Sequence, residues 1–297
     1  MKRSTEIKKA SAILMSDPHL RLSIPVCRTD EEFLEAQWKK LQFIKDLQKV
    51  HGCIVLCGGD LFHHWKPAPE LITKTMEYLP DKFYTIYGQH DLPNHSLKEQ
   101  EKSGIYALKT AGALTLLPGC HWGMDPKDTP PLTLSGGNIS RKVLVWHKMN
   151  YQGKLPWPEC TDPKAIGLLR KYPEYDLILT GDNHKAFTET YEGRLLVNPG
   201  SLARQTADQI DFKPRVYLYY ADENRVEPTF LPIRDDVVTR EHLDRSEERS
   251  DRISAFITKL GGEWQAGMSF EANLKKFFSS NTIRESVKEK VYKAIEL

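Results

Sequence analysis

The strongest constraint on the fold of this chain is a unit that recurs five times, in which a short apolar run ends in a cluster of polar residues. The runs, each with the cluster that follows it, are 12–15 before Ser16-Asp17-Pro18-His19, 54–56 before Gly58-Gly59-Asp60, 83–87 before Gly88-Gln89-His90-Asp91, 143–146 before His147, and 177–179 before Gly181-Asp182-Asn183-His184. Short apolar runs bounded by such clusters are typical of buried strands. Each run is therefore predicted to be a strand that delivers polar side chains from its C-terminal end.

Segments of helical periodicity alternate with these runs, which indicates an α/β or α+β layered domain. The segment Thr29-Asp30-Glu31-Glu32 fits a capping box, and apolar residues follow at helical spacing until Gly52 ends the helix. Further helices are expected at 69–78, 104–110 and 163–171, and later strands at 186–191, 194–198, 216–220 and 226–230, with a hairpin turn at 191–194.

The composition changes after Ile233. Residues 235–252 are dense in charge, and helical patterns follow at 251–260, 270–278 and 282–297. We therefore predict one domain over residues 1–234 and a helical segment over residues 235–297. Its amphipathic helices could simply pack onto the larger domain.

Composition also limits the compartment and the partners. The chain has 42 Lys and Arg against 40 Asp and Glu, so any DNA contact must come from local patches rather than from a strong overall field. Five cysteines, an odd number with Cys53 and Cys57 in or beside an apolar run, favour a reducing compartment. No apolar run is long enough to span a bilayer. We expect a cytoplasmic protein with no membrane partner.

The polar clusters share one chemistry, because all of them offer carboxylate, imidazole or carboxamide groups. These groups bind hard or borderline divalent cations. A pair such as Asp17 and His19, or a lone Gly59-Asp60, is common in proteins and carries little information alone. Loops at the C-terminal ends of strands converge on one rim of a layered domain. The ordered recurrence of all five clusters therefore predicts a metal centre.

These blocks resemble the five signature motifs of the calcineurin-like metallophosphoesterases, over residues 12–201. Within that class, Gly59-Asp60-Leu61-Phe62, Asn198-Pro199-Gly200-Ser201 and the C-terminal segment are most similar to the SbcD-type DNA-repair nucleases, including phage relatives. The resemblance implies a four-layer αββα sandwich with a small C-terminal helical appendage. Residues 1–234 would be the catalytic domain, and residues 235–297 a capping or partner-docking segment, with packing onto the catalytic domain as the alternative.

The resemblance also implies a role for each motif residue. The first ion would be held by Asp17, His19, Asp60 and His184, and the second by Asp60, Gln89, His147 and Asp182, so that Asp60 bridges the two. His90 would stabilise charge on the phosphate or protonate the leaving alkoxide, and Asp91 would orient His90.

Two positions depart from the family pattern, because asparagine normally stands at Gln89 and histidine at Asp182. Both replacements can still ligate, and the carboxylate makes the second site harder and more negative. Oxygen-rich ligation favours harder ions, so we expect two divalent ions, with Mn²⁺ preferred and Mg²⁺ the alternative.

Four further residues are candidates for binding the substrate phosphate: His63, His64, Ser201 and Arg204. Loop histidines are more often ordinary solvated residues, and Ser201 and Arg204 could equally form a strand-end turn. Trp65-Lys66-Pro67 and Lys148-Met149-Asn150-Tyr151 combine bases with aromatic rings, which suits stacking on single-stranded nucleic acid, although aromatic residues packed between layers give the same pattern.

The sequence therefore predicts a metal-dependent phosphodiesterase, acting as a DNA exonuclease or endonuclease in repair, recombination or phage DNA metabolism. Its partners would be single- or double-stranded DNA and an SMC-like ATPase subunit or a second copy of the chain. One alternative is a phosphodiesterase for small nucleotides or other phosphoesters. Another is a noncatalytic partner-binding subunit that keeps the fold, as the altered Gln89 and Asp182 would allow.

Overall fold

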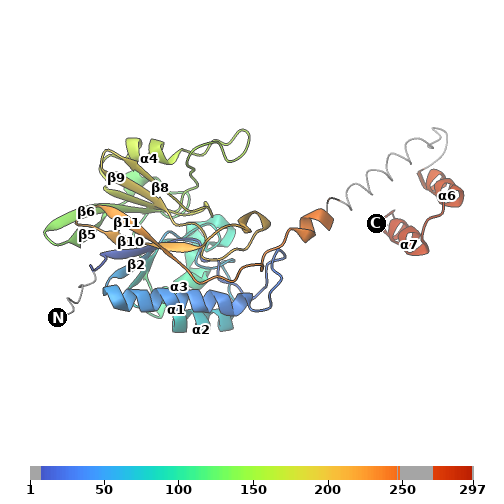
Figure 1. The fold of residues 1–297 in the computed structure, drawn as a ribbon. Helices are drawn as coiled ribbons and strands as arrows, with labels where there is room; N and C mark the ends of the chain where they lie inside the picture. The colour runs from blue at the N-terminus through green and yellow to red at the C-terminus, as the bar shows by residue number, and fades with distance from the viewer. Residues whose placement is uncertain (1–7, 246, 248–269, 296–297) are drawn as a thin grey trace. The chain divides into compact units, whose positions relative to one another are not determined.

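The computed structural model describes residues 8–245, 247 and 270–295 of the chain (Figure 1). It divides into two compact units, Met1–Thr239 and Arg240–Leu297. The domain boundary predicted at Arg234 lies a few residues before this division. Val237 and Val238 belong to the first unit, where they form a small buried cluster with Cys27 and Ala207.

Two sheets form the body of the first unit. One has the order β11-β10-β1-β2-β3-β4 and the other the order β5-β6-β7-β9-β8. The strands of the first sheet are β1 (Ala12–Met15), β2 (Ile54–Cys57), β3 (Phe83–Thr85), β4 (Thr115–Leu116), β10 (Arg215–Tyr220) and β11 (Arg225–Phe230). Those of the second are β5 (Leu132–Gly136), β6 (Ile139–Trp146), β7 (Leu177–Thr180), β8 (Phe187–Tyr191) and β9 (Arg194–Asn198).

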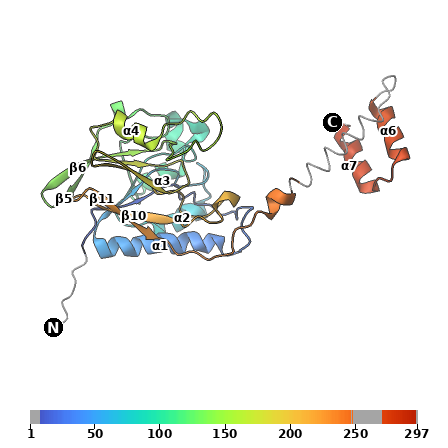
Figure 2. The same cartoon turned by 45° about the horizontal axis from the view of Figure 1, so that its top comes forward.

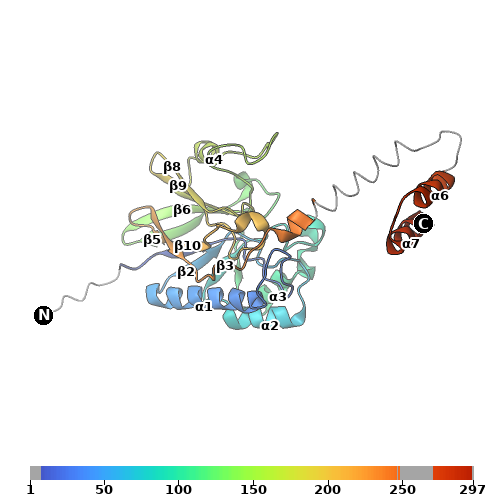
Figure 3. The same ribbon diagram turned by 45° about the vertical axis from the view of Figure 1, so that its right-hand side comes forward.

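Helices cover the outer face of each sheet. The helices α1 (Phe33–His51), α2 (Pro69–Tyr78) and α3 (Gly104–Thr110) lie together on one side of the sheets, and α4 (Ala165–Lys171) lies on the other (Figures 1, 2 and 3). Short 3-10 turns occur at η1 (Pro93–His95), η2 (Leu97–Lys102), η3 (Pro126–Asp128) and η4 (Ala207–Gln209).

Strand β1 shows why the apolar runs are continuous rather than alternating. Ile13 belongs to the buried cluster that contains Trp38 of α1, whereas Leu14 belongs to the cluster that contains Val145 of β6 and Leu179 of β7. A strand covered on both faces buries every side chain, so successive residues are all apolar.

The second sheet is covered in the same way. Leu144 of β6 and Ile178 of β7 pack in a third cluster with Leu168 of α4. The order of layers is therefore helix, sheet, sheet, helix, and the predicted αββα sandwich is confirmed.

Most element boundaries agree with the sequence prediction, but the start of α1 does not. The helix begins at Phe33 after Glu32, which makes no side-chain capping hydrogen bond, so the predicted capping box is wrong. Thr29 instead donates its hydroxyl to the main-chain oxygen of Asp236, at 3.3 Å. The predicted end of α1 is confirmed, because Gly52 follows the last turn with φ of 68°.

Besides a helical stretch at 241–245, the described part of the second unit includes the helices α6 (Phe270–Ser280) and α7 (Glu285–Ile295). They form their own small core, in which Leu274, Phe277 and Phe278 are buried and Val291 and Tyr292 pack against them. The predicted helical appendage is confirmed for these two helices, whereas the helix predicted at 251–260 lies outside the described residues.

The helices and the cysteines of the described residues relate to the predicted compartment. Among the residues that the structure describes, no helix is both long and apolar enough to cross a membrane. No disulfide joins any of the five cysteines, and Cys27, Cys53, Cys57 and Cys120 are buried. The reducing compartment and the cytoplasmic location remain predictions.

Replacing Lys40 with methionine is expected to remove a pH dependence of stability. Lys40 lies on α1 with only 3% of its surface exposed, and the described residues offer its ammonium no hydrogen-bond or ion-pair partner. Burial, and then repulsion from Arg28 and Arg204, lowers the pKa of Lys40 to about 7. The unfolded chain binds more protons than the folded one between this pKa and the ordinary value of 10.5, so stability rises with pH in that window.

The free energy of unfolding should therefore rise by about 2 kcal/mol between pH 7 and pH 9 in the unmodified chain, and much less in Lys40→Met. Urea denaturation at both pH values measures this. Lys39→Met is the matched control, because Lys39 is the exposed neighbour on the same helix. Parallel pH profiles for the Lys40→Met and unmodified chains would contradict the prediction.

Candidate metal centre

The polar clusters meet because their strands run side by side in the same direction. Strands β1, β2 and β3 are parallel neighbours, as are β6 and β7, so the loops that follow them leave at one rim. Four predicted ligands in these loops have left-handed backbone, with φ of 49° at Asp17, 45° at His19, 52° at Asp60 and 77° at Asp182. Such conformations cost about 1–3 kcal/mol each in residues other than glycine and are concentrated at functional sites.

One group of ligand atoms comes from Asp17, His19 and His184, whose atoms lie within 4.8 Å of one another. The Nε2 atoms of His19 and His184 face each other at 3.0 Å. Burial holds the pKa of His19 well below its ordinary value, so this imidazole is neutral. Neutral imidazole is the form that ligates metal.

Asp60 lies between this group and a second one, formed by Asp17, Asp60 and His147. Its Oδ2 atom is 3.6 Å from Nε2 of His19 and 3.4 Å from Nε2 of His147. Burial opposes ionisation of Asp60, but the neighbouring His147 holds its pKa below the ordinary value. The position between the two groups is the one that a bridging carboxylate requires.

The donor atoms fit divalent cations. Asp17 Oδ2 and Asp60 Oδ2 are buried and have no hydrogen-bond partner among the described residues. Leaving a buried polar oxygen without a partner is costly, and more so when it is charged. Burial also raises the pKa of Asp17, because the charged form of a buried carboxylate is disfavoured. A cation bound here would satisfy both oxygens.

Both departures from the family pattern, Gln89 and Asp182, lie within the site. Gln89 approaches His147 through Oε1, 2.8 Å from Nε2, and donates through Nε2 to Asp182 Oδ1 at 2.7 Å. The main-chain N–H of Asp182 donates to Asp17 Oδ1 at 3.0 Å. Their ligation remains a prediction, since the structure shows them linked to each other and to ligands of both groups.

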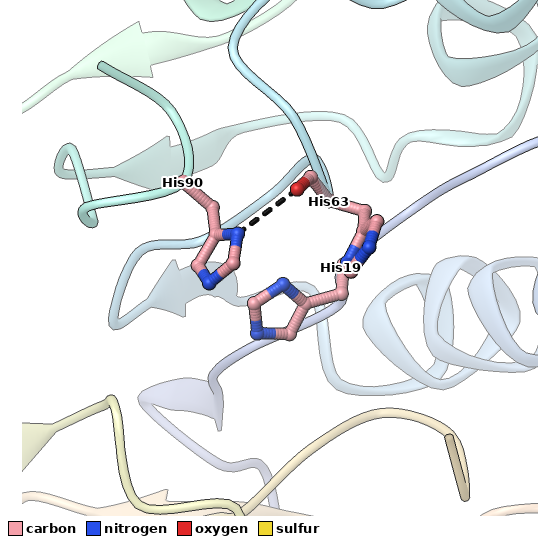
Figure 4. Close-up of side chains that lie close together, drawn as sticks. All are labelled: His19, His63 and His90. Carbon is pink, nitrogen blue, oxygen red and sulfur yellow. Dashed lines mark hydrogen bonds between the residues drawn. The ribbon is translucent and has the colours of Figure 1, made fainter. Parts of the chain in front are cut away.

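His90 lies beside the first group, as predicted for a residue that acts on the phosphate. Its ring centroid is 4.7 Å from that of His19, and Figure 4 shows its Nδ1 bonded to the main-chain oxygen of His63, at 2.9 Å. Because a carbonyl only accepts, Nδ1 donates and Nε2 is left for a ligand. The main-chain N–H of His90 donates to Asp60 Oδ1 at 2.9 Å.

The described hydrogen bonds of the Asp91 carboxylate are made to main-chain groups and not to the His90 ring, so its role in orienting His90 stays a prediction. Its carboxylate accepts main-chain N–H groups from Leu61, Phe62 and Gly88, at 3.2, 3.1 and 3.0 Å. Burial, and then the charge of Asp60, raises the pKa of Asp91. Asp91 therefore ties the loop after β2 to the loop after β3, and the His63 carbonyl orients His90.

Close backbone approach around Asp60 makes Gly88 a sensitive position. A Cβ atom at Gly88 would lie 2.0 Å from Asp60 Oδ1 and 2.6 Å from its main-chain nitrogen. We expect Gly88→Ala to lower the free energy of unfolding by about 1–3 kcal/mol and to reduce metal binding. Gly167→Ala on α4 is the control, because its Cβ would meet nothing within 4 Å and alanine favours helix. Chemical denaturation of both variants tests this, and equal stabilities would refute it.

The family model of the calcineurin-like phosphoesterase superfamily domain matches residues 11–213, which include the whole second sheet, strands β1 to β4 of the first sheet and all these residues. The chain belongs to the calcineurin-like phosphoesterase superfamily. Metal-dependent hydrolysis of phosphoesters is the chemistry that this membership implies. A search of curated protein sequences gave no match.

Several solved structures align with this chain at low identity. An archaeal phosphodiesterase aligns over 74% of this chain and 99% of its own, with 12% identity and a TM-score of 0.41. Vacuolar Protein Sorting 29 from Cryptosporidium parvum aligns over 74% and 95%, with 14% identity and 0.36. A putative 5′-nucleotidase from Staphylococcus aureus aligns over 76% and 54%, with 12% identity and 0.46.

Ser201 and Arg204 are buried and bonded within the protein, so substrate contact through them stays a prediction that the geometry does not favour. The Ser201 hydroxyl donates to the oxygen of Ala203 at 2.9 Å and accepts from Gln209 at 2.6 Å. The Arg204 guanidinium donates to the main-chain oxygens of Ile210 and Arg234. Both residues hold loops together, as in the strand-end turn that was the alternative interpretation.

The Asn198-Pro199-Gly200-Ser201 motif also has a structural role within this superfamily member. The Asn198 amide donates to the oxygens of Asn183 and Lys185, at 2.5 and 2.7 Å, on either side of His184. The main-chain N–H of Ser201 donates to the oxygen of His184 at 3.2 Å. The motif therefore fixes the loop that carries a predicted ligand.

His63 lies closer to the centre than His64. His19, His63 and His90 form a third group with ligand atoms within 4.8 Å of one another, and their rings approach one another in Figure 4. His64 is exposed and accepts the main-chain N–H of Lys66 at 3.2 Å. Substrate contact through His63 and through His64 stays a prediction, and both side chains line a cavity that Gln89 and His90 also line.

A cavity of about 680 Å³ adjoins the centre at His147 and Asp182, and we call it the tryptophan cavity because Trp122 and Trp157 line it. The sequence analysis identified neither tryptophan. Both lie in irregular loops far apart along the chain, so only the tertiary structure brings them to the metal centre. Tyr151, predicted as a stacking residue, is buried, in agreement with the packing alternative.

Proposed function

We propose that the chain is a metal-dependent phosphodiesterase that cleaves DNA, as an exonuclease, an endonuclease or both. The observation that carries this proposal is the position of Asp60 Oδ2, buried, unpartnered and between His19 and His147, with His90 beside the group. Two adjacent groups of candidate metal ligands, with the His90 imidazole beside them, match what in-line displacement at a phosphodiester requires.

Each residue would have a defined part in the reaction. Two divalent ions, when bound, would polarise the phosphate and lower the pKa of the attacking water. Asp17, His19 and His184 would hold one ion, and His147, Gln89 and Asp182 the other, with Asp60 shared. The carboxylate at Asp182 supports our proposal of Mn²⁺, with Mg²⁺ as the alternative.

His90 would act on the leaving group. The His63 carbonyl fixes its Nδ1, so Nε2 is the atom free to donate a proton to the departing oxygen or to stabilise charge on the phosphate. Because the ring is only partly buried, it can meet a substrate that enters from solvent.

The narrower assignment to the SbcD-type nucleases is part of the same proposal. It is supported by Gly59-Asp60-Leu61-Phe62, by Asn198-Pro199-Gly200-Ser201 and by the appended helices. We propose single- or double-stranded DNA as the substrate in a cytoplasmic setting of repair, recombination or phage DNA metabolism. An SMC-like ATPase or a second copy of the chain is the proposed protein partner.

End-labelled single- and double-stranded DNA, incubated with Mn²⁺, Mg²⁺ or chelator, tests the proposal beside bis-p-nitrophenyl phosphate. We expect metal-dependent cleavage of DNA and of the small diester, both lost in chelator. Cleavage of the small diester alone would replace the nuclease proposal with a small-substrate phosphodiesterase. Failure to cleave either substrate at any metal concentration would reject catalysis by the isolated chain.

A further inference from the structure

The tryptophan cavity has the walls of a base-binding site rather than of a simple water channel. Its apolar lining comes from tryptophan and methionine side chains, including Trp122, Met124, Met149 and Trp157, and His147 and Asp182 stand at its boundary with the metal centre. Polarisable thioethers and indole rings adapt to flat aromatic ligands. A volume of about 680 Å³ lies within the range typical of small-molecule sites.

The tryptophans are not equivalent, and two of them are available to a ligand. Trp146 is 6% exposed and packs edge-on against Tyr172, with ring centroids 5.6 Å apart, so it is part of the core. Trp157 is 47% exposed, in a loop between β6 and α4. Trp122 is partly exposed, and its ring is 5.5 Å from that of His95. Trp122 and Trp157 therefore offer ring surface, while Trp146 supplies a fixed wall.

Polar groups in the same cavity complement a nucleotide. Lys148 Nζ is 3.5 Å from Asp162 Oδ1, and both side chains are partly exposed. An ammonium group can neutralise a phosphate, and a carboxylate can accept from the exocyclic amino group of a base. The cavity thus combines stacking surface, one cation and one acceptor beside the metal centre.

We propose that the tryptophan cavity binds one unstacked nucleobase of the substrate, next to the phosphate that is cleaved. This inference rests on the proposed phosphodiesterase function and specifies its substrate class as single-stranded or frayed nucleic acid. A base can enter such a cavity only after it leaves the stack, which costs least in a single strand. Stacking on aromatic rings also tolerates every base, so little sequence preference is expected.

The first test is binding, which does not depend on catalysis. Quenching of tryptophan fluorescence by deoxyadenosine 5′-monophosphate is compared with that by deoxyribose 5-phosphate, which has the same phosphate but no base. We expect the nucleotide to bind at least about 10-fold more tightly, and Trp157→Ala to remove most of this advantage. Equal affinities for the two phosphates would overturn the proposal. Phe230→Ala, which truncates an exposed aromatic residue on β11, is the control.

The second test separates this inference from the proposed function. Hydrolysis of thymidine 5′-(p-nitrophenyl phosphate) is compared with that of methyl p-nitrophenyl phosphate, which lacks a base. Trp157→Ala should lower kcat/KM about 10-fold or more for the thymidine ester and leave the methyl ester unchanged. An equal loss for both esters, or no loss for either, would overturn base binding while leaving phosphodiesterase activity established. If neither ester is hydrolysed, the proposed function fails, and the binding test still decides whether the cavity binds a base.

Discussion

Asp60→Asn is expected to abolish metal binding and hydrolysis together, while leaving the loop that carries it folded. Asp60 Oδ1 accepts the main-chain N–H of His90, and the asparagine oxygen can keep this bond. The asparagine NH₂ group would then replace Oδ2, the atom that faces His19 and His147. A neutral donor at this point repels a cation, so kcat/KM should fall by about 10³-fold or more.

Metal content after dialysis against Mn²⁺, measured by plasma mass spectrometry, and hydrolysis of bis-p-nitrophenyl phosphate check this result. Asp46→Asn is the control, because Asp46 is an exposed carboxylate on α1 that pairs with Lys49. An Asp60→Asn protein that kept both its Mn²⁺ and its rate would disprove the shared role of Asp60. Circular dichroism of the variant excludes unfolding as the cause.

The buried part of the fold was predictable because strands buried on both faces have apolar sequences. Strand β1 lies between two layers, so Ala12–Met15 reads as an unbroken apolar run. The end of α1 was predictable because Gly52 takes a left-handed conformation there. By contrast, β4, which pairs with β3, has only the two residues Thr115–Leu116. Two residues are too few to show any periodicity.

What the sequence could not predict at the site is which side chains bind main-chain groups. Asp91 and Arg204 are charged side chains near motif residues, and both make hydrogen bonds to backbone groups of other loops, those after β2 for Asp91 and Arg234 for Arg204. A sequence pattern shows which side chains can do chemistry, but it cannot show which main-chain atoms compete for them. The Thr29 hydroxyl, bonded to the oxygen of Asp236, is the same case in the scaffold.

The sequence could predict that the candidate ligands lie close together, because the sheet fixes where their loops begin. Asp17, His19 and Asp60 keep left-handed backbone although none is glycine. The main-chain N–H groups of Asp17 and His19 donate to the oxygens of Gly59 and Asp60, at 3.1 and 2.9 Å, so the two loops hold each other in place. Strain of this kind persists only where the surroundings over-determine the conformation.

His90→Ala should lose turnover on DNA while still binding metal, in contrast to Asp60→Asn. His90 is outside the two groups that include Asp60 and Asp17, and its ring is held by the His63 carbonyl. Loss of a general acid lowers the rate by about 10²–10⁴-fold. Plasma mass spectrometry and single-turnover digestion of end-labelled DNA measure the two effects separately. His242→Ala, a histidine in the second unit, is the control.

The choice of leaving group decides what His90 does. The alkoxide that leaves from DNA needs a proton, whereas p-nitrophenolate leaves readily without one. If Nε2 of His90 supplies the proton, His90→Ala should lose far more activity on DNA than on bis-p-nitrophenyl phosphate. Equal losses on both substrates would instead assign His90 to charge stabilisation at the phosphate, since that role does not depend on the leaving group. A fully active variant would remove His90 from the mechanism altogether. The group of His19, His63 and His90 would then need another function.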